Sequence, residues 1–126
     1  MATLQAATMS TGAIVSDPQA VRQLCENYRF GTLNWEVTEE GELTIWVHDD
    51  FEVYEARENG LPDYEGGIVT HEFLRELADH LGADEELDIQ TAGFTKCRFP
   101  VLAKRYVVRD GEVLHTDLSS LEPIDE

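Results

Sequence analysis

Two stretches of strictly alternating apolar and polar residues, separated by a short turn, constrain the fold of this chain most strongly. Their apolar positions are Leu33, Trp35 and Val37, then Leu43, Ile45 and Val47. The segment Glu39-Glu40-Gly41 lies between them. Period-two alternation places successive side chains on opposite faces of a strand, and a short loop with glycine is typical of a β-hairpin. We therefore predict a hairpin with one buried face.

Helical patterns lie on both sides of this hairpin. The first helix is predicted to start at Ser16 or Asp17, with Pro18 in its first turn and apolar residues at i, i+3, i+4 and i+7 from Val21 onward. The second is predicted from Thr70 as N-cap to residue 81, before a closing glycine.

Strand patterns follow each helix, which gives the order α-β-β-β-α-β-β-β. After the hairpin, residues 51–54 suggest a third strand, and residues 87–91, 97–109 and 113–116 follow the second helix. A change in the buried set indicates a bulge near Lys104-Arg105. Strands joined by short turns form antiparallel sheets. We predict an α+β fold, a two-layer sandwich with about five to six antiparallel strands and two helices on one face.

The length of 126 residues fits one domain. We assign residues 16–118 to a single α+β domain. Residues 1–15 lack a clear period, so we expect a flexible N-terminal lead or a short edge strand. Residues 119–126 are interpreted as an acidic C-terminal tail.

Charge is the most unusual feature of the composition. The chain has 26 Asp and Glu against nine Lys and Arg, a formal net charge of -17. Such a surplus destabilises a compact state by self-repulsion unless it is screened, and at molar salt the Debye length falls to about 3 Å. The composition resembles that of halophilic proteins from organisms that accumulate salt. An acidic mimic of DNA would carry the same charges and is a further alternative.

Compartment and cofactors are constrained by what the sequence lacks. It has no apolar run long enough to span a bilayer and no secretory signal pattern, so we expect a cytoplasmic protein without a membrane partner. Two cysteines 72 positions apart form no disulfide framework. The histidines and cysteines lack the spacing of metal ligands, so we predict neither a metal site nor a cofactor.

Catalytic residues are not evident in this pattern. Cys97 with His115 and Asp117 is the sharpest triad available, but it depends on residue type alone. We assign no catalytic residue, and an enzyme using Cys97 or His115 is the third class of function considered.

The outer face of the hairpin is the first candidate binding surface. Alternation places Asn34, Trp46 and His48 opposite the predicted core. Large aromatic side chains on a solvent face often mark a subunit or ligand contact. The leading interpretation is therefore a non-enzymatic binding or assembly module that acts through its sheet face, as a homodimer.

The segment 94–109 is the second candidate. It carries five of the nine cations and no acid, interleaved with aromatic residues, a pattern typical of nucleic-acid-binding strands. The candidates there are Lys96, Arg98, Lys104, Arg105 and Tyr106. Pairing of these cations with acids on neighbouring strands is the favoured alternative, so binding of nucleic acid or another anionic ligand is the second function considered.

Overall fold

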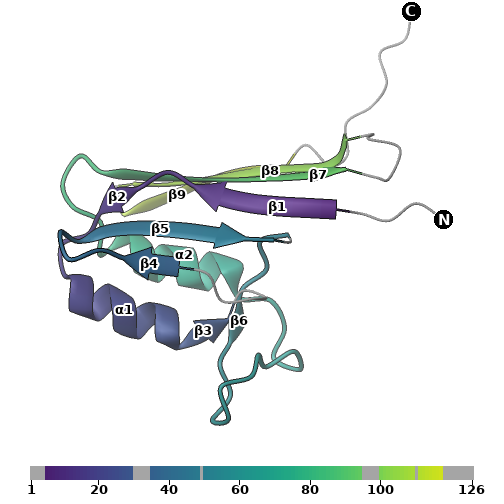
Figure 1. The fold of residues 1–126 in the computed structure, drawn as a ribbon, viewed down its shortest axis with the longest axis horizontal. Helices are drawn as coiled ribbons and strands as arrows, with labels where there is room; N and C mark the ends of the chain where they lie inside the picture. The colour runs from purple at the N-terminus through teal and green to yellow at the C-terminus, as the bar shows by residue number, and fades with distance from the viewer. Residues whose placement is uncertain (1–4, 30–34, 49, 95–99, 110, 118–126) are drawn as a thin grey trace, which may run out of the picture.

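A computed structural model describes residues 5–29, 35–48, 50–94, 100–109 and 111–117. Within these residues a seven-strand antiparallel sheet forms one layer and two helices form the other (Figure 1). Both helices lie on the same face of the sheet, which confirms the predicted α+β class.

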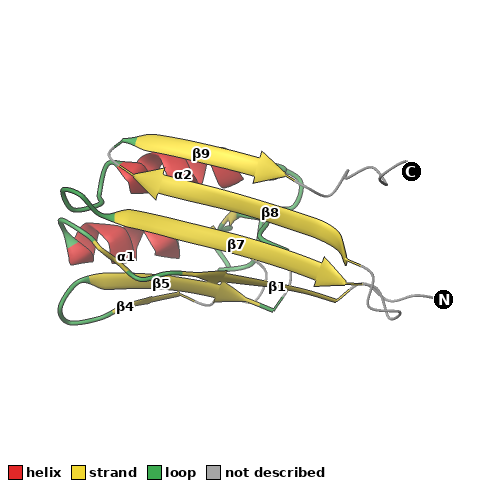
Figure 2. Cartoon of the chain, turned by 90° about the horizontal axis from the view of Figure 1, so that it is seen from above, coloured by secondary structure: helices red, strands yellow, loops and turns green. Residues whose placement is uncertain are grey.

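The elements of the large sheet are β1 (Gln5–Ser10), β2 (Ala13–Ile14), β4 (Trp35–Val37), β5 (Glu42–Val47), β7 (Glu86–Phe94), β8 (Pro100–Arg109) and β9 (Glu112–Asp117). The helices are α1 (Pro18–Glu26) and α2 (Thr70–Ala78), and a small sheet pairs β3 (Tyr28–Arg29) with β6 (Tyr54–Glu55). Across the large sheet the order is β5-β1-β7-β8-β9, and both β2 and β4 also pair with β5. Figure 2 shows β7, β8 and β9 side by side.

The N-terminal segment differs most from the sequence-based expectation. β1 lies between β5 and β7, where Thr8 is opposite both Val47 and Thr91. It is a central strand, not a lead or an edge, and with β2 it raises the number of strands above the five or six expected. The inward positions of β1 include Thr8 and Ser10, whose hydroxyls are satisfied. Thr8 Oγ1 lies 2.7 Å from Thr91 Oγ1, and Ser10 Oγ accepts a 2.8 Å hydrogen bond from the Ile45 amide.

The first helix forms as its pattern predicts. Asp17 is the N-cap, and its side chain accepts a hydrogen bond from the Ala20 amide at 3.2 Å. Val21 and Cys25 lie on the inner face of α1 and are fully buried. Burial, with a smaller contribution from the adjacent Glu26 charge, raises the pKa of the Cys25 thiol to about 12. Cys25 is therefore a protonated core residue, as expected of a small side chain on the apolar face.

The second helix starts one residue earlier than expected. Val69 occupies the cap position and Thr70 is the first helical residue. Thr70 Oγ1 instead accepts a 3.1 Å hydrogen bond from the Val53 amide, which ties the helix start to the preceding buried segment. The apolar face of the helix is buried as predicted, including Phe73, Leu74 and Leu77.

The β4–β5 hairpin confirms the alternating pattern. Val37, Leu43, Ile45 and Val47 are buried, and Gly41 adopts a φ of +88° in the turn, a conformation that favours glycine. These side chains form one core with the apolar faces of both helices.

The bulge predicted near Lys104-Arg105 is wrong. The pairing of β7 with β8 is continuous from Ala92 opposite Ala103 to Glu86 opposite Arg109, and the irregularity lies between Gly93 and Phe94. Because a shift of one residue exchanges the two faces of a strand, Lys104 faces the helices and Ala103 faces away from them.

Candidate interface on the outer sheet face

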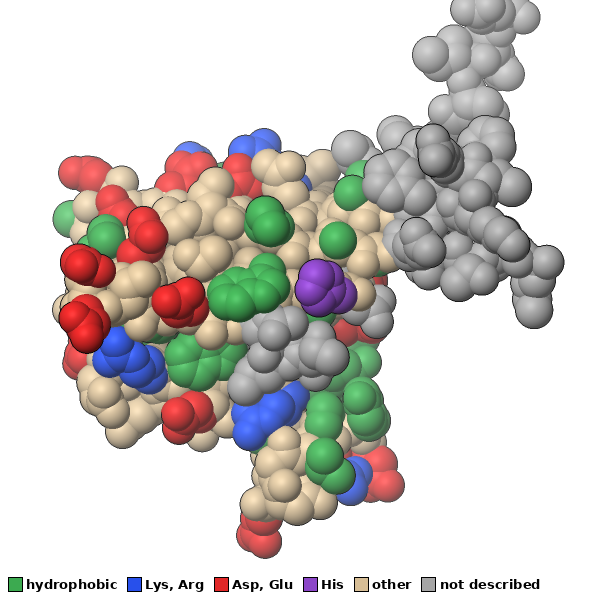
Figure 3. Space-filling view, viewed as in Figure 1, with side chains coloured by type: hydrophobic (Ala, Val, Ile, Leu, Met, Phe, Trp, Pro, Cys, Tyr) green, Lys and Arg blue, Asp and Glu red, His purple; other side chains and the backbone are tan. Residues whose placement is uncertain are grey.

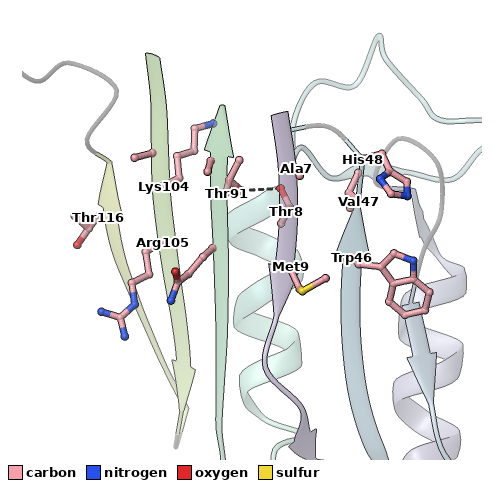
Figure 4. Close-up of a pocket in the computed structure, with 13 residues that line it drawn as sticks. Ala7, Thr8, Met9, Trp46, Val47, His48, Thr91, Lys104, Arg105 and Thr116 are labelled. Atoms are coloured by element: carbon pink, nitrogen blue, oxygen red, sulfur yellow. Dashed lines mark hydrogen bonds between the residues drawn. The ribbon is translucent and has the colours of Figure 1, made fainter. Parts of the chain in front are cut away.

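The face of the large sheet that points away from both helices is the strongest candidate site, and we call it the outer face. A hollow of about 640 Å³ on this side is lined by 13 residues from β1, β5, β7, β8 and β9 and from the residue that follows β5 (Figure 4). They are Ala7, Thr8, Met9, Trp46, Val47, His48, Gln90, Thr91, Ala92, Ala103, Lys104, Arg105 and Thr116. Strand alternation brings together side chains that are far apart in the sequence.

Apolar side chains dominate the accessible part of the outer face. Met9 is opposite Trp46 in the β1–β5 pairing, and Figure 4 shows the two side chains next to each other. Met9 is 67% exposed and Trp46 is partly buried. In the middle of the face, Ala7 and Ala92 are opposite each other and both are exposed, which leaves room above the backbone.

Acidic residues are absent from the lining of the hollow. The chain has 26 acids in 126 residues, whereas none of the 13 lining residues is Asp or Glu. Elsewhere, Figure 3 shows acidic side chains at the left end of the view, along its upper edge and at its bottom, with apolar side chains exposed near its middle. The hollow is therefore a region of low negative charge on a strongly acidic protein.

The two cations in the lining have acidic partners. Arg105 binds the Asp88 carboxylate through contacts of 2.7, 3.1 and 3.2 Å. Hydrogen bonding from Arg105 lowers the pKa of Asp88 below its usual value. Lys104 points to the other side of the sheet, where its Nζ lies 2.8 Å from an oxygen of Asp50.

Cross-strand pairing also accounts for the third described cation of the basic segment. Arg109 lies 3.7 Å from Glu86 on β7 and 3.8 Å from Glu112 on β9. The three described cations of the segment 94–109 therefore pair with acids, the alternative favoured from the sequence. Lys104 and Arg105 also lie on opposite faces, so they do not form one basic surface.

The predicted site residues are not all brought together. Trp46 and His48 both line the hollow on the outer face. Tyr106 is 6% exposed and packs toward the helices against Phe51, with ring centroids 5.9 Å apart. Asn34, Lys96 and Arg98 lie outside the described residues, as does Cys97.

Several residues of the hollow were missed by sequence reasoning. Ala7 and Met9 were missed because their strand was not recognised, and Ala92 and Ala103 because alanine gives no signal of binding. The exposure of Met9 beside Trp46 becomes visible only when β1 is placed next to β5.

A second apolar patch lies on the loop between β6 and α2. Leu61, Tyr64 and Ile68 are 60%, 64% and 55% exposed, and Tyr64 packs edge-on against Tyr54 at 4.8 Å. The same loop carries Asp63 and Glu65, which lie 3.5 and 4.0 Å from Arg57.

Other classes of site find little support in the described part of the chain. No three His, Cys, Asp or Glu side chains of the described ranges are grouped so as to hold a metal ion. None of the described helices has the length and apolar character needed to cross a membrane. A scan of protein-family models and searches of curated proteins and of solved structures find no match to this chain, so the site stands on its geometry alone.

Proposed function

We propose that this protein is a salt-adapted, non-enzymatic assembly module that forms a homodimer through its outer sheet face. The observation that carries the proposal is the combination of exposed Met9, partly buried Trp46 and a hollow with no acid in its lining, on the face that neither of the two described helices covers. Exposed apolar area of this kind is typical of protein interfaces. Sheets that pack face to face fill the space between them with interdigitating side chains, which would cover both residues.

The charge of the hollow favours a second copy as the partner. A basic partner is matched best by an acidic surface, which this chain offers on other faces. A partner that is itself acidic must approach where there are fewest acids, because like charges across an interface are costly. A second copy of this chain, with a net charge of -17, is such a partner.

The polar groups of the hollow argue against a charged small molecule as the occupant. Ligand sites combine apolar walls with a few polar groups that fix the ligand's orientation. Here the guanidinium of Arg105 is already bound by Asp88, and the ammonium of Lys104 by Asp50. An anionic ligand would have to displace one of these carboxylates.

Salt adaptation fits the same account. Two copies with this charge repel each other at long range in dilute buffer, and molar salt removes that repulsion while leaving apolar contacts intact.

A charge inserted into the hollow tests the proposed dimer. Ala92→Glu places a carboxylate on the exposed centre of the outer face, and each dimer would then contain two. We expect the dissociation constant to rise at least about 100-fold, equivalent to about 2.7 kcal/mol. Gln23→Glu, on the exposed side of α1, makes the same change in net charge and is the matched control.

Sedimentation velocity in molar KCl measures both variants. The proposal predicts a monomer for Ala92→Glu and an unchanged dimer for Gln23→Glu. Equal self-association of the two variants would show that the outer face is not the interface.

A further inference from the structure

A pair of histidines on the helix side of the sheet forms a possible metal site, separate from the outer face. His71 is the second residue of α2, and His115 lies in β9, 44 positions later in the sequence. Their ring centroids are 5.7 Å apart. Both side chains are exposed, so an ion from solvent can reach them.

The surrounding structure fixes this spacing. His115 is opposite Tyr106 in the β8–β9 pairing and stacks on its ring, with centroids 4.7 Å apart and an interplanar angle of 19°. Tyr106 is itself buried against Phe51. The His71 ring meets Tyr106 edge-on at 6.0 Å. Both imidazoles therefore contact one buried aromatic ring, and the two imidazole planes lie at 67° to each other.

The distance suits two imidazoles that share one ion. A nitrogen–metal bond of about 2.1 Å places the metal roughly 3.2 Å from each ring centroid. Two such rings are then about 5.2 Å apart at a tetrahedral angle and about 6.4 Å apart when they are opposite each other. The observed 5.7 Å lies between these values.

The ligand type selects the class of metal. Neutral imidazole binds zinc, copper and nickel, whereas magnesium and calcium prefer oxygen ligands. His71 also lines a cavity of about 420 Å³ beside α2 and β8, whose lining includes Glu52, Glu72, Arg75 and Lys104 but not His115. The carboxylate of Glu72, in the same helical turn, offsets the positive end of the helix.

We propose that His71 and His115 together bind one divalent transition metal ion, with Zn²⁺ as the probe. This pair is not recognisable from the sequence, because zinc signatures depend on ligands a few residues apart. Two protein ligands leave open positions on the metal, so binding should be weaker than at a structural zinc site.

Calorimetric titration with Zn²⁺ in molar KCl tests the site, with excess Mg²⁺ present to occupy carboxylates. One saturable site per chain is expected. His71→Gln and His115→Gln should each weaken binding by at least about tenfold, since even the loss of an outer-shell partner commonly costs 10–100-fold. His80→Gln, which removes a histidine two residues beyond the C-terminal end of α2, is the matched control and should bind as the wild type does.

Three results would overturn the proposal. The first is the absence of saturable binding by the folded wild type. The second is an equal loss of Zn²⁺ affinity in His80→Gln. The third is a loss of Zn²⁺ affinity in Cys97→Ser, which would assign the ion to the thiol. Electron paramagnetic resonance with Cu²⁺ gives a second readout that needs no variant. It should show hyperfine coupling to two imidazole nitrogens, and coupling to one or none would contradict the shared site.

Discussion

At the residue scale, the Arg105–Asp88 pair predicts a specific pH dependence of stability. The folded pKa of Asp88 lies below its unfolded value near 3.9, because Arg105 binds the charged form. The pair therefore stabilises the fold above that unfolded value, and its contribution disappears as the pH falls through the lower, folded pKa. Arg105→Gln should lower the free energy of unfolding by a small but measurable amount at pH 7, because the pair lies at the surface.

Urea unfolding at neutral and acidic pH measures this effect. The difference between wild type and Arg105→Gln should be constant above pH ~5 and shrink below pH ~4. Arg57→Gln is a control, because the contacts of Arg57 with Asp63 and Glu65 are longer, at 3.5 and 4.0 Å. A difference for Arg105→Gln that is the same at both pH values would mean that the pair does not stabilise the fold.

Trp46 and Ile45 are adjacent residues on opposite faces of β5, which gives a second prediction at this scale. Ile45 is fully buried, so Ile45→Ala should cost about 2–5 kcal/mol of unfolding free energy. Trp46→Ala should cost the monomer roughly 1 kcal/mol or less and weaken self-association instead. Chemical denaturation of dilute protein and sedimentation separate the two effects. A Trp46→Ala protein that keeps the wild-type mass but unfolds easily would place Trp46 in the core.

At the scale of elements, the success of sequence reasoning follows the kind of residue that each element buries. The hairpin and both helices bury Val, Leu, Ile and Phe with clear periods, so their existence and buried faces were predicted. β1 buries Thr8 and Ser10, whose hydroxyls bond to neighbouring strands, and no apolar period reveals it. The outer face was predicted only in part for this reason. Trp46 and His48 were recognised on β5 and at its end, whereas Met9 on β1 was not.

The central position of β1 predicts that the N-terminal segment is required for folding. Deleting residues 1–11 removes the strand that joins β5 to β7 and exposes both edges. We expect the truncated protein to lack cooperative thermal unfolding, as followed by circular dichroism in molar KCl. A truncated protein that melts cooperatively near the wild-type temperature would contradict the central placement of β1.

At the scale of the whole molecule, the charge of -17 predicts a requirement for salt. At 10 mM ionic strength the Debye length is about 30 Å, so charges across the whole domain repel one another. Circular dichroism should show loss of cooperative structure at that ionic strength and recovery at molar KCl. An unchanged melting temperature would argue against salt adaptation and in favour of DNA mimicry.

The molecular mass in solution as a function of KCl tests the central claim most directly. Light scattering in molar KCl should give twice the chain mass of 14.2 kDa. As salt is lowered within the range where the chain stays folded, the mass should fall toward that of one chain, because repulsion between the two copies returns. A mass of 14.2 kDa in molar KCl at every concentration, or a dimer that becomes tighter as salt is removed, would contradict a dimer held by the apolar outer face.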